Sequence, residues 1–414
     1  MRKRLEDSMN PRPFSDVGIL ALVPDEWGMV WQPRHHVLTR LAQYFHVIWI
    51  NPAHEWREIP TRLKTRLTKT SIGGFRPQGL DIYTPELWLP KLYRPRWLAQ
   101  LTVQQRLARA RRRLMNQGCR KIVLYLWRPE FECELRSAAY DHTCYHIDDE
   151  YSFSTVEVPL DQAEARLIAS VDQVFIHSRA LLEKKGTINP NTSYIPNGVD
   201  YCAYSALVPE PVDLATIPRP RIGYTGYLKN QLDWHLIVHL TRQHPEWSFV
   251  FVGPVKPHPE TFGVIEELSR RSNVYFLGPK TAQVLAAYPQ HFDVCLMPYL
   301  TNDYSRYIYP LKLHEYLASG QPIVGTRIRS LEEFTDVVAL ASTPATWSKA
   351  ITEALHSDAT TPERRGARQA VARQHDWQVL VGRIARIIAE RLGKEFGDRF
   401  PNCGSESTAV QLGR

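Results

Sequence analysis

Short hydrophobic runs alternate with stretches of helical spacing along most of the chain. Residues 16–23 (DVGILALV) and 46–52 (HVIWINP) are typical of strands, and between them apolar residues recur every three or four positions, as in a helix. A strand–helix–strand beginning favours a parallel sheet. Further apolar runs that we interpret as strands begin at 121, 144, 171, 221, 247, 273, 291, 322 and 337. The predicted fold class is α/β.

The 414 residues exceed what one hydrophobic core usually supports. We therefore expect two doubly wound, Rossmann-like domains that face each other across a cleft. The expected organisation is a flexible N-terminus (1–14), an N-terminal domain (15–200), a proline-rich linker (201–220), a C-terminal domain (221–375), an amphipathic last helix (376–396) and a disordered tail (397–414). Parallel sheets bind ligands beyond the carboxyl ends of their strands, so the loops at those ends are candidate site segments.

Composition predicts a soluble, cytoplasmic globular protein. Hydrophobic residues make up 43% of the chain and charged residues 23%. No apolar run reaches the roughly 18 residues that span a bilayer, and the basic start lacks the apolar core of a secretory signal. The six cysteines are scattered without C-x-x-C pairs, which disfavours a zinc site or a disulfide framework and fits a reducing compartment.

Positive charge is concentrated between residues 57 and 121. This segment holds 16 Lys and Arg residues against three acidic ones, whereas the whole chain has a net charge of only +8. Its second half places Trp and Tyr beside arginines, a composition that suits an interfacial element on an anionic membrane surface. The alternative is a solvated basic helix that packs its leucines on the sheet. A nucleic-acid partner is not expected, because no nucleic-acid-binding motif accompanies the charge.

Residues 307–326 (YIYPLKLHEYLASGQPIVGT) are typical of a turn, a short helix and a buried strand. Lys312 and Glu315 are three residues apart and therefore share one helix face, away from the apolar stripe. Gly320 and Pro322 end the helix. Lysine donates to phosphate, and a carboxylate accepts hydrogen bonds from a sugar diol, so the pair suits a ligand with both groups. The alternative is an ordinary exposed ion pair on an amphipathic helix.

The pattern P-x-K-x-x-E-Y-L-A-x-G-x-P-I-V resembles the nucleotide-sugar signature of GT-B glycosyltransferases, in the family-4-like group that builds bacterial polysaccharides of the teichuronic-acid type. This resemblance implies that Glu315 holds the ribose of the donor nucleotide and that the last helix crosses back to the N-terminal domain. Many members carry a second Glu eight residues upstream, where this chain has Tyr307. The resemblance also implies that basic groups and helix dipoles offset the diphosphate charge, with no metal ion or other cofactor.

The start of the second domain carries a glycine turn, Gly223-Tyr-Thr-Gly226, whose small residues let the backbone approach a diphosphate. The resemblance implies a basic residue just after this turn, for which Lys229 is the candidate, although the usual Arg position holds Tyr227. It further implies that the loop of 273–281 holds the base and that residues just before Lys312 contact the sugar. The predicted donor-binding residues are Gly223, Thr225, Gly226, Lys229, Gly278, Lys280, Tyr307, Tyr309, Lys312 and Glu315.

Two further segments are candidates for catalysis and acceptor binding. Three consecutive acids, Asp148 to Glu150, follow a strand, and one of them could act as the general base that deprotonates an acceptor hydroxyl. By resemblance to inverting GT-B families, Asp149 fits this role best and Asp148 next; the alternative is helix capping or loop solvation. The loop after the first strand supplies the predicted acceptor-side residues Trp27, Gly28, Arg34 and His35, for which the alternative is a surface helix start.

Together these features predict a glycosyltransferase of the hexosyltransferase type. It would move a sugar from a nucleotide-diphospho-sugar, with a UDP-sugar as the expected donor, to a hydroxyl of a lipid-linked or polysaccharide acceptor in cell-surface glycan synthesis. The expected location is the inner face of the plasma membrane. The alternatives are a nucleotide-sugar epimerase of the same fold and a non-catalytic nucleotide-sugar-binding or membrane-scaffold protein.

Overall fold

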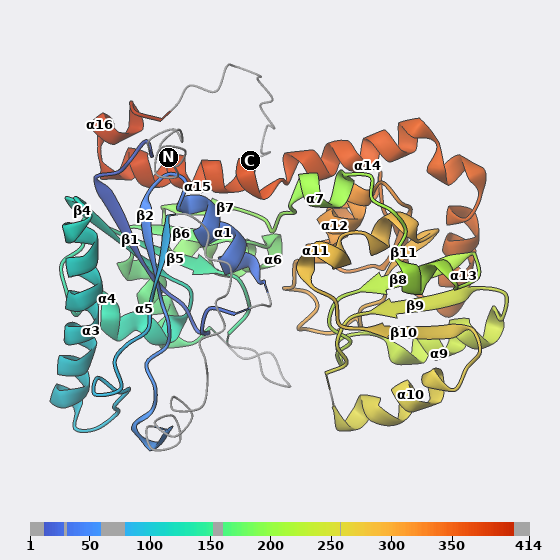
Figure 1. Ribbon diagram of the computed structural model, residues 1–414, viewed down its shortest axis with the longest axis horizontal. Coiled ribbons are helices and arrows are strands. Elements are labelled where there is room, and N and C mark those ends of the chain that lie inside the picture. Colours follow the sequence, from blue (N-terminus) through green and yellow to red (C-terminus); the bar gives the residue numbers. More distant parts are fainter. Residues whose placement is uncertain (1–11, 29–30, 59–78, 152–159, 257, 401–414) are drawn as a thin grey trace, which may run out of the picture. The chain divides into compact units, whose positions relative to one another are not determined.

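The computed structural model describes residues 12–28, 31–58, 79–151, 160–256 and 258–400. The chain divides into two compact units: residues 1–27, 37–144 and 381–414 form one, and residues 28–36 and 145–380 form the other. Two sheets of parallel strands, each flanked by helices, provide the framework (Figure 1). Most of the predicted flexible start and most of the predicted tail lie outside the described residues.

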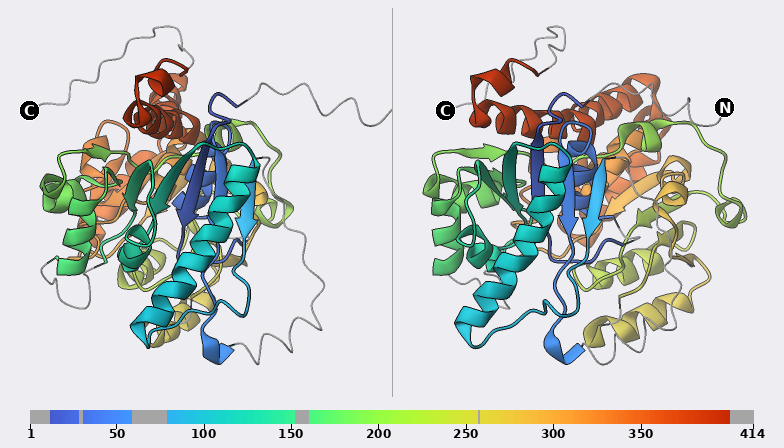
Figure 2. Two further views of the ribbon diagram at one scale, coloured as in Figure 1. Left: turned by 90° about the vertical axis from the view of Figure 1, so that its left-hand side faces the viewer. Right: turned by 60° about the vertical axis from the view of Figure 1, so that its left-hand side comes forward.

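The first sheet has seven strands in the order β3-β2-β1-β4-β5-β6-β7. They are β1 (Val17–Leu22), β2 (His46–Ile50), β3 (Leu80–Tyr83), β4 (Lys121–Leu126), β5 (His142–Ile147), β6 (Gln173–Ile176) and β7 (Thr192–Tyr194). Its helices are α1 (Pro33–Leu41), α3 (Arg96–Asn116), α4 (Glu132–Leu135), α5 (Gln162–Ser170) and α6 (Arg179–Lys185). The strand order reverses beside β1, which pairs with both β2 and β4, as in doubly wound folds. The long helix α3 packs on β1 and β2 (Figure 2).

The second sheet has six strands in the order β10-β9-β8-β11-β12-β13. They are β8 (Arg221–Thr225), β9 (Ser248–Val252), β10 (Val274–Gly278), β11 (Val294–Met297), β12 (Ile323–Thr326) and β13 (Ala339–Ala341). The helices around it are α9 (Trp234–Gln243), α10 (Pro259–Ser269), α11 (Ala282–Leu285), α12 (Leu311–Ser319), α13 (Pro344–Ala354) and α14 (Pro362–Gln374). The four central strands β8, β9, β11 and β12 are buried on both faces, which explains why they are near-continuous apolar runs in the sequence.

Local sequence signals fix several element ends. Asp233 accepts a hydrogen bond from the backbone N–H of Leu236 and so caps α9. Gly320 ends α12 in the left-handed conformation, with φ of 76°, which glycine adopts at little cost. Residues 201–220, expected as a linker, contain two short helices, α7 (Tyr201–Ser205) and α8 (Val212–Ala215).

The C-terminal part of the described chain is helical. It forms α15 (Trp377–Leu392) and α16 (Lys394–Gly397), and the boundary between the two units falls inside α15. Among the described residues, none of the helices combines the length and the apolar character needed to cross a bilayer.

Candidate functional site

Helix α12 presents the residues that the sequence singled out. Its apolar side is fully buried against the second sheet, whereas Lys312 and Glu315 keep partial solvent contact on another face. Its C-terminal end is held by α14: Arg368 donates to the carbonyl oxygen of Gly320 at 3.0 Å and Gln369 to that of Ala318 at 3.2 Å. These donors satisfy carbonyl groups that a helix end leaves unpaired, so the orientation of α12 is fixed.

Two glycines shape the backbone next to Lys312. Gly226 follows β8 with φ of 114°, and Gly253 follows β9 with φ of 149°. A Cβ atom on Gly226 would lie 2.6 Å from Cε of Lys312, and a Cβ atom on Gly253 would lie 2.1 Å from the carbonyl oxygen of Gly226. Only glycine fits both positions, because each combines a left-handed backbone with a close neighbour. The sequence analysis found Gly226 but missed Gly253, since its partner is more than twenty residues away.

A cluster of lysines borders this turn. Within the part of the chain that the structure describes, Lys312 has no ion-pair partner, and it forms no ion pair with Glu315. Its ammonium lies 5.0 Å from the centre of the Tyr224 ring. Burial lowers the pKa of Lys229, and the positive charges of Lys312 and Lys256 lower it further. Mutually repelling ammonium groups beside a glycine turn favour a bound anion. Lys256 was not predicted, because only the packing of β8 on β9 brings it here.

Glu315 is half-buried on the same helix. Burial raises its pKa, although the nearby charge of Lys312 and a hydrogen bond from Tyr204 oppose that change. Tyr204 comes from α7, inside the segment expected as a linker, and its side chain is buried. The backbone N–H of Thr225 donates to the hydroxyl of Tyr316 at 2.8 Å, which ties the end of β8 to α12. Thr225, Gly226, Lys229, Lys312 and Glu315 are therefore brought together as predicted from the sequence.

The other five predicted donor-binding residues lie in β8, at and just after the end of β10, and just before α12. Gly223 is inside β8, where a Cβ atom would meet the ring of Phe292 at 2.1 Å. Gly278 ends β10 with φ of 68°. Lys280 pairs with Asp213 at 2.7 Å. Tyr307 and Tyr309 are both buried. The hydroxyl of Tyr309 is bonded to Nε2 of His314 at 2.8 Å, and Lys184 lies 5.0 Å above the Tyr307 ring. Ligand contact by these five residues stays a prediction.

Basic partners explain how three consecutive acids are tolerated after β5. Asp148 accepts hydrogen bonds from Arg34 at 3.3 Å and from the hydroxyl of Tyr151. Glu150 pairs with the fully buried Lys185 at 3.0 Å, and Lys185 also pairs with the buried Glu164 at 2.9 Å. Neither Lys185 nor Glu164 was singled out from the sequence.

Asp149 differs from its two neighbours. Its carboxylate accepts a hydrogen bond from the backbone N–H of Glu150 at 2.9 Å. Its negative charge also acts on Lys229, where it favours the protonated form. Of the three acids, Asp149 is therefore the one whose field reaches the lysine cluster. Among the described residues, the structure contains no group of three or more His, Cys, Asp or Glu side chains placed to hold a metal ion.

The predicted acceptor-side residues are divided between the two units. Trp27, in the first unit, donates its backbone N–H to Asn51 at 2.9 Å and meets the Trp49 ring edge-on. Gly28, Arg34 and His35 belong to the second unit. Both Arg34 and His35 are buried; Arg34 pairs with Asp148, and Nδ1 of His35 accepts a hydrogen bond from the backbone N–H of Gln32 at 3.2 Å.

Comparison with known proteins relates the chain to sugar-transferring enzymes. Residues 219–357 match the family described as Glycosyl transferases group 1. A curated relative from Bacillus subtilis (strain 168), TuaH, is named as a teichuronic acid biosynthesis glycosyltransferase and is 30% identical over 239 residues. That match covers 55% of this chain and 59% of the relative, so the chain spans less than two thirds of the relative's length.

Solved structures show the fold. A glycosyltransferase from Rickettsia africae superposes with a TM-score of 0.66. The structure titled "Trehalose-6-phosphate from E. coli bound with UDP-2-fluoro glucose" superposes with a TM-score of 0.64. Each is 12% identical in sequence, and each match covers 91% of this chain and 99% of the other chain. The alpha,alpha-trehalose 6-phosphate synthase from Burkholderia multivorans has a TM-score of 0.60 at 13% identity, covering 91% of this chain and 98% of that one. The predicted GT-B fold is thus confirmed, and the segment that matches the group 1 family, residues 219–357, carries Gly226, Lys312 and Glu315.

Proposed function

We propose that the protein is a glycosyltransferase that moves a hexosyl group from a nucleotide-diphospho-sugar to a hydroxyl of a glycan acceptor. One observation carries this proposal. Lys312 is a partly buried ammonium group without an ion-pair partner among the described residues, and it lies against the Gly226 turn within the segment that matches the group 1 family. An unpaired, partly desolvated cation is costly unless an anionic ligand neutralises it.

Each group in the proposed donor site has a distinct role. Lys312 and Lys229 bind the diphosphate, and Gly226 lets its backbone approach. Glu315 accepts hydrogen bonds from the ribose hydroxyls, for which its carboxylate must be ionised. A UDP-sugar is the donor that we propose, because a structure with the same fold is described as bound with UDP-2-fluoro glucose.

The proposed transfer is an inverting displacement with Asp149 as general base. The acceptor oxygen forms a bond to the anomeric carbon while the bond from that carbon to the diphosphate breaks. The acceptor proton passes to Asp149, and the nucleoside diphosphate leaves with the electron pair. The action of the Asp149 charge on Lys229 supports this assignment, since it brings a carboxylate near the lysine cluster. Neutralising the leaving diphosphate is the larger catalytic effect.

Replacing Asp149 with asparagine should lower kcat for sugar transfer by about 10²–10⁴-fold, because the amide cannot accept the proton. Donor affinity measured by calorimetry should stay within about threefold, since the proposed donor contacts are made by other residues. The assay is release of nucleoside diphosphate from a panel of UDP-, GDP- and dTDP-sugars with glycan acceptors, with product stereochemistry determined by NMR.

Asp148→Asn is the matched control. It should reduce stability through loss of the Arg34 contact but keep more activity than Asp149→Asn. Wild-type-like kcat in Asp149→Asn, or a retained anomeric configuration in the product, would remove the base assignment.

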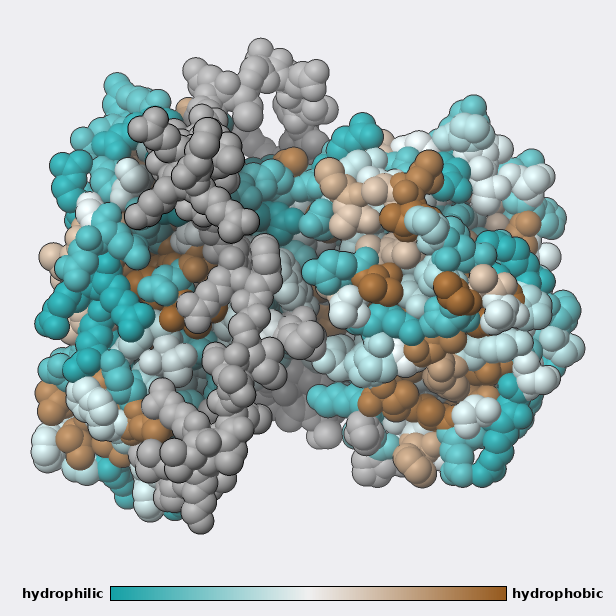
Figure 3. Space-filling view, in the orientation of Figure 1, coloured by the Kyte–Doolittle hydropathy of each residue, from teal (hydrophilic) through white to brown (hydrophobic). Residues whose placement is uncertain are grey.

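We further propose a lipid-linked acceptor and a cytoplasmic enzyme docked on an anionic membrane surface through the segment 57–121. The described part of this segment exposes large aromatic side chains: Trp88 is 62% exposed, Tyr93 59% and Trp97 68%. They belong to α3 and the loop before it, where Figure 3 shows apolar side chains gathered at the lower left. Aromatic side chains flanked by arginines are typical of surfaces at the lipid headgroup level.

Not all arginines of this segment are available to lipid. Arg106 donates to the carbonyl oxygen of Pro90 at 2.9 Å, and Arg109 pairs with Glu86 at 3.0 Å. Arg94, Arg96 and Arg112 are exposed and have no ion-pair partner among the described residues. These three side chains are therefore the ones to neutralise in a test of membrane binding.

Flotation with phosphatidylglycerol vesicles should be reduced about 100-fold in the Arg94→Gln/Arg96→Gln/Arg112→Gln variant. The estimate follows from about 1 kcal/mol per basic side chain near an anionic surface. Replacing three exposed arginines elsewhere, Arg327, Arg364 and Arg383, should leave flotation unchanged. Equal flotation with neutral phosphatidylcholine, or equal losses in both triple variants, would contradict the proposed docking surface.

A further inference from the structure

A cavity of about 610 Å³ lies at the amino-terminal edge of the second sheet. Arg219 and Pro220 precede β8, Phe292 and Asp293 precede β11, and Gln321 follows α12. The rest of the wall comes from Ala354, Leu355, Thr360 and Arg365. Because the strands are parallel, this edge is opposite to the one that carries Gly226 and Gly253. The cavity is therefore distinct from the proposed donor site.

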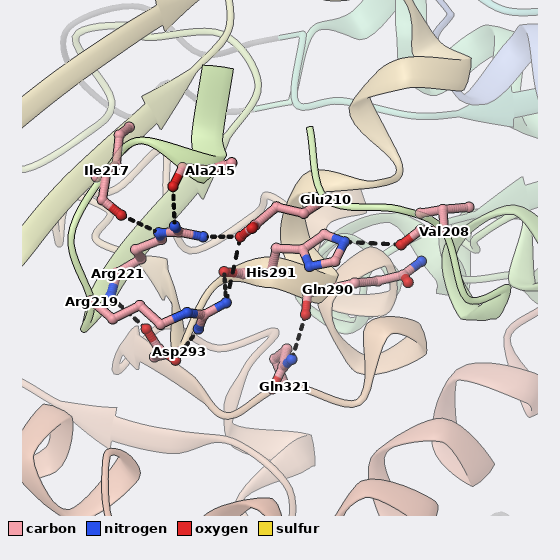
Figure 4. Close-up of polar contacts among 10 residues, drawn as sticks. All are labelled: Val208, Glu210, Ala215, Ile217, Arg219, Arg221, Gln290, His291, Asp293 and Gln321. Atoms are coloured by element: carbon pink, nitrogen blue, oxygen red, sulfur yellow. Dashed lines mark hydrogen bonds and ion pairs between the residues drawn. The ribbon is translucent and has the colours of Figure 1, made fainter. Parts of the chain in front are cut away.

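Two residues that line the cavity, Arg219 and Asp293, belong to an electrically balanced network (Figure 4). Glu210 lies between Arg219 and Arg221 and pairs with both. Asp293 pairs with Arg219 and also accepts the backbone N–H of Arg221 at 2.6 Å. Two guanidinium groups thus face two carboxylates. Because Arg219 is paired with both carboxylates, this network leaves no excess positive charge at the cavity.

Another part of the cavity lining has positive charge without an acidic partner. Arg365 has no ion pair among the described residues, and its hydrogen bond to the carbonyl oxygen of Ser319 is long, at 3.4 Å. Next to it, Arg368 is only 7% exposed and bonds to the carbonyl oxygens of Gly320 and Ala359, at 3.0 and 2.9 Å. Its Nε atom has no hydrogen-bond partner. Among the described residues, these two adjacent guanidinium groups are hydrogen-bonded to carbonyl oxygens, and no acidic side chain balances their positive charge.

We propose that this cavity binds a phosphorylated small molecule, with Arg365 as the group that holds the phosphate. Guanidinium groups bind phosphate oxygens through paired, charge-assisted hydrogen bonds. The volume is in the range of small-molecule sites. Thr360 and Gln321 provide polar groups for a hydroxylated body, and Phe292 and Leu355 provide an apolar surface. The ligand class is a sugar phosphate or a phosphate monoester of similar size.

Calorimetric titration with glucose 6-phosphate tests this site. The titration uses the full chain carrying Lys229→Ala and Lys312→Ala, so that phosphate binding at the proposed donor site does not contribute. In this background we expect saturable binding at submillimolar concentration, with no binding of glucose. Adding Arg365→Gln should weaken it at least tenfold, and Arg365→Lys should weaken it less, because the charge is kept while the fork of donors is lost.

Arg364→Gln is the matched control, since Arg364 is exposed, lies on the same helix and does not line the cavity. It should bind glucose 6-phosphate as the background does. Equal binding in Arg365→Gln and Arg364→Gln, glucose binding as well as its phosphate, or no binding at 10 mM would each overturn the proposal. The titration involves no sugar transfer, so its outcome is independent of the proposed glycosyltransferase activity.

Discussion

Replacing Lys312 with methionine is expected to lower kcat for sugar transfer by about 10²–10³-fold, the usual cost of removing one preorganised group that stabilises developing negative charge. The ammonium lies against the glycine turn at the end of β8 and has no ion-pair partner among the described residues. Its charge is therefore available to the diphosphate. Methionine keeps most of the length and apolar volume of lysine, so the contact with Gly226 is largely kept.

The pH dependence of donor affinity separates an electrostatic role of Lys312 from a merely structural one. Burial raises the pKa of Glu315, whereas the charge of Lys312 lowers it. Protonation removes the acceptor for ribose hydroxyls, so affinity falls as the pH drops through this pKa. Without Lys312 the pKa rises further, and the loss of affinity should begin at a higher pH. Calorimetry with the donor between pH 5 and 8 measures this shift.

Lys349→Met is the matched control for Lys312→Met. Lys349 is exposed, and its ammonium lies 3.8 Å from Glu353 on the surface of α13. This variant should keep wild-type kcat and the wild-type pH profile. If Lys312→Met also kept kcat and donor affinity, the assignment of the donor site to α12 would be wrong.

Replacing Lys185 with methionine should destabilise the protein by about 3–5 kcal/mol, because it leaves the buried Glu164 without its cation and the buried Glu150 with Lys184 alone. Lys185 is fully buried and lies 3.0 Å from Glu150 and 2.9 Å from Glu164. The free energy of unfolding in urea measures the loss. Because Glu150 follows Asp149 directly, we also expect lower transfer activity in this variant.

The loss of stability caused by Lys185→Met should be smaller at low pH. Burial already raises the pKa of Glu164, and Lys185 counteracts that rise. Without the lysine, the folded-state pKa of Glu164 rises further above the unfolded-state value. Acidification then stabilises the folded variant, since it takes up protons before the unfolded chain does. Unfolding curves at pH 5 and pH 8 should show this difference.

Lys184→Met is the control for the buried pair. Lys184 is the preceding residue on α6, keeps 18% exposure and lies 3.4 Å from Glu150. Its removal should cost less than that of Lys185, because Glu150 then keeps its pair with Lys185. Equal losses in both variants, or a loss in Lys185→Met that does not change with pH, would show that the buried network contributes little.

The sequence by itself determined the order and type of the main elements and the helix face shared by Lys312 and Glu315. Apolar runs of four to six residues predicted the strands, because parallel strands are buried on both faces. The spacing of Lys312 and Glu315 placed both on one face of α12, and Gly320 ended that helix. These signals are local, since helix spacing, caps and glycine turns depend on residues a few positions apart.

Tertiary structure alone decided which groups surround that helix. Gly253 and Lys256 follow β9, and the pairing of β9 with β8 brings them beside Gly226 and Lys229. Tyr204 reaches Glu315 from a segment whose prolines indicated a linker. Lys280, one of the predicted donor-binding residues, pairs with Asp213. Such contacts join residues tens of positions apart, and no local pattern encodes them, because strand order and helix packing determine which side chains meet.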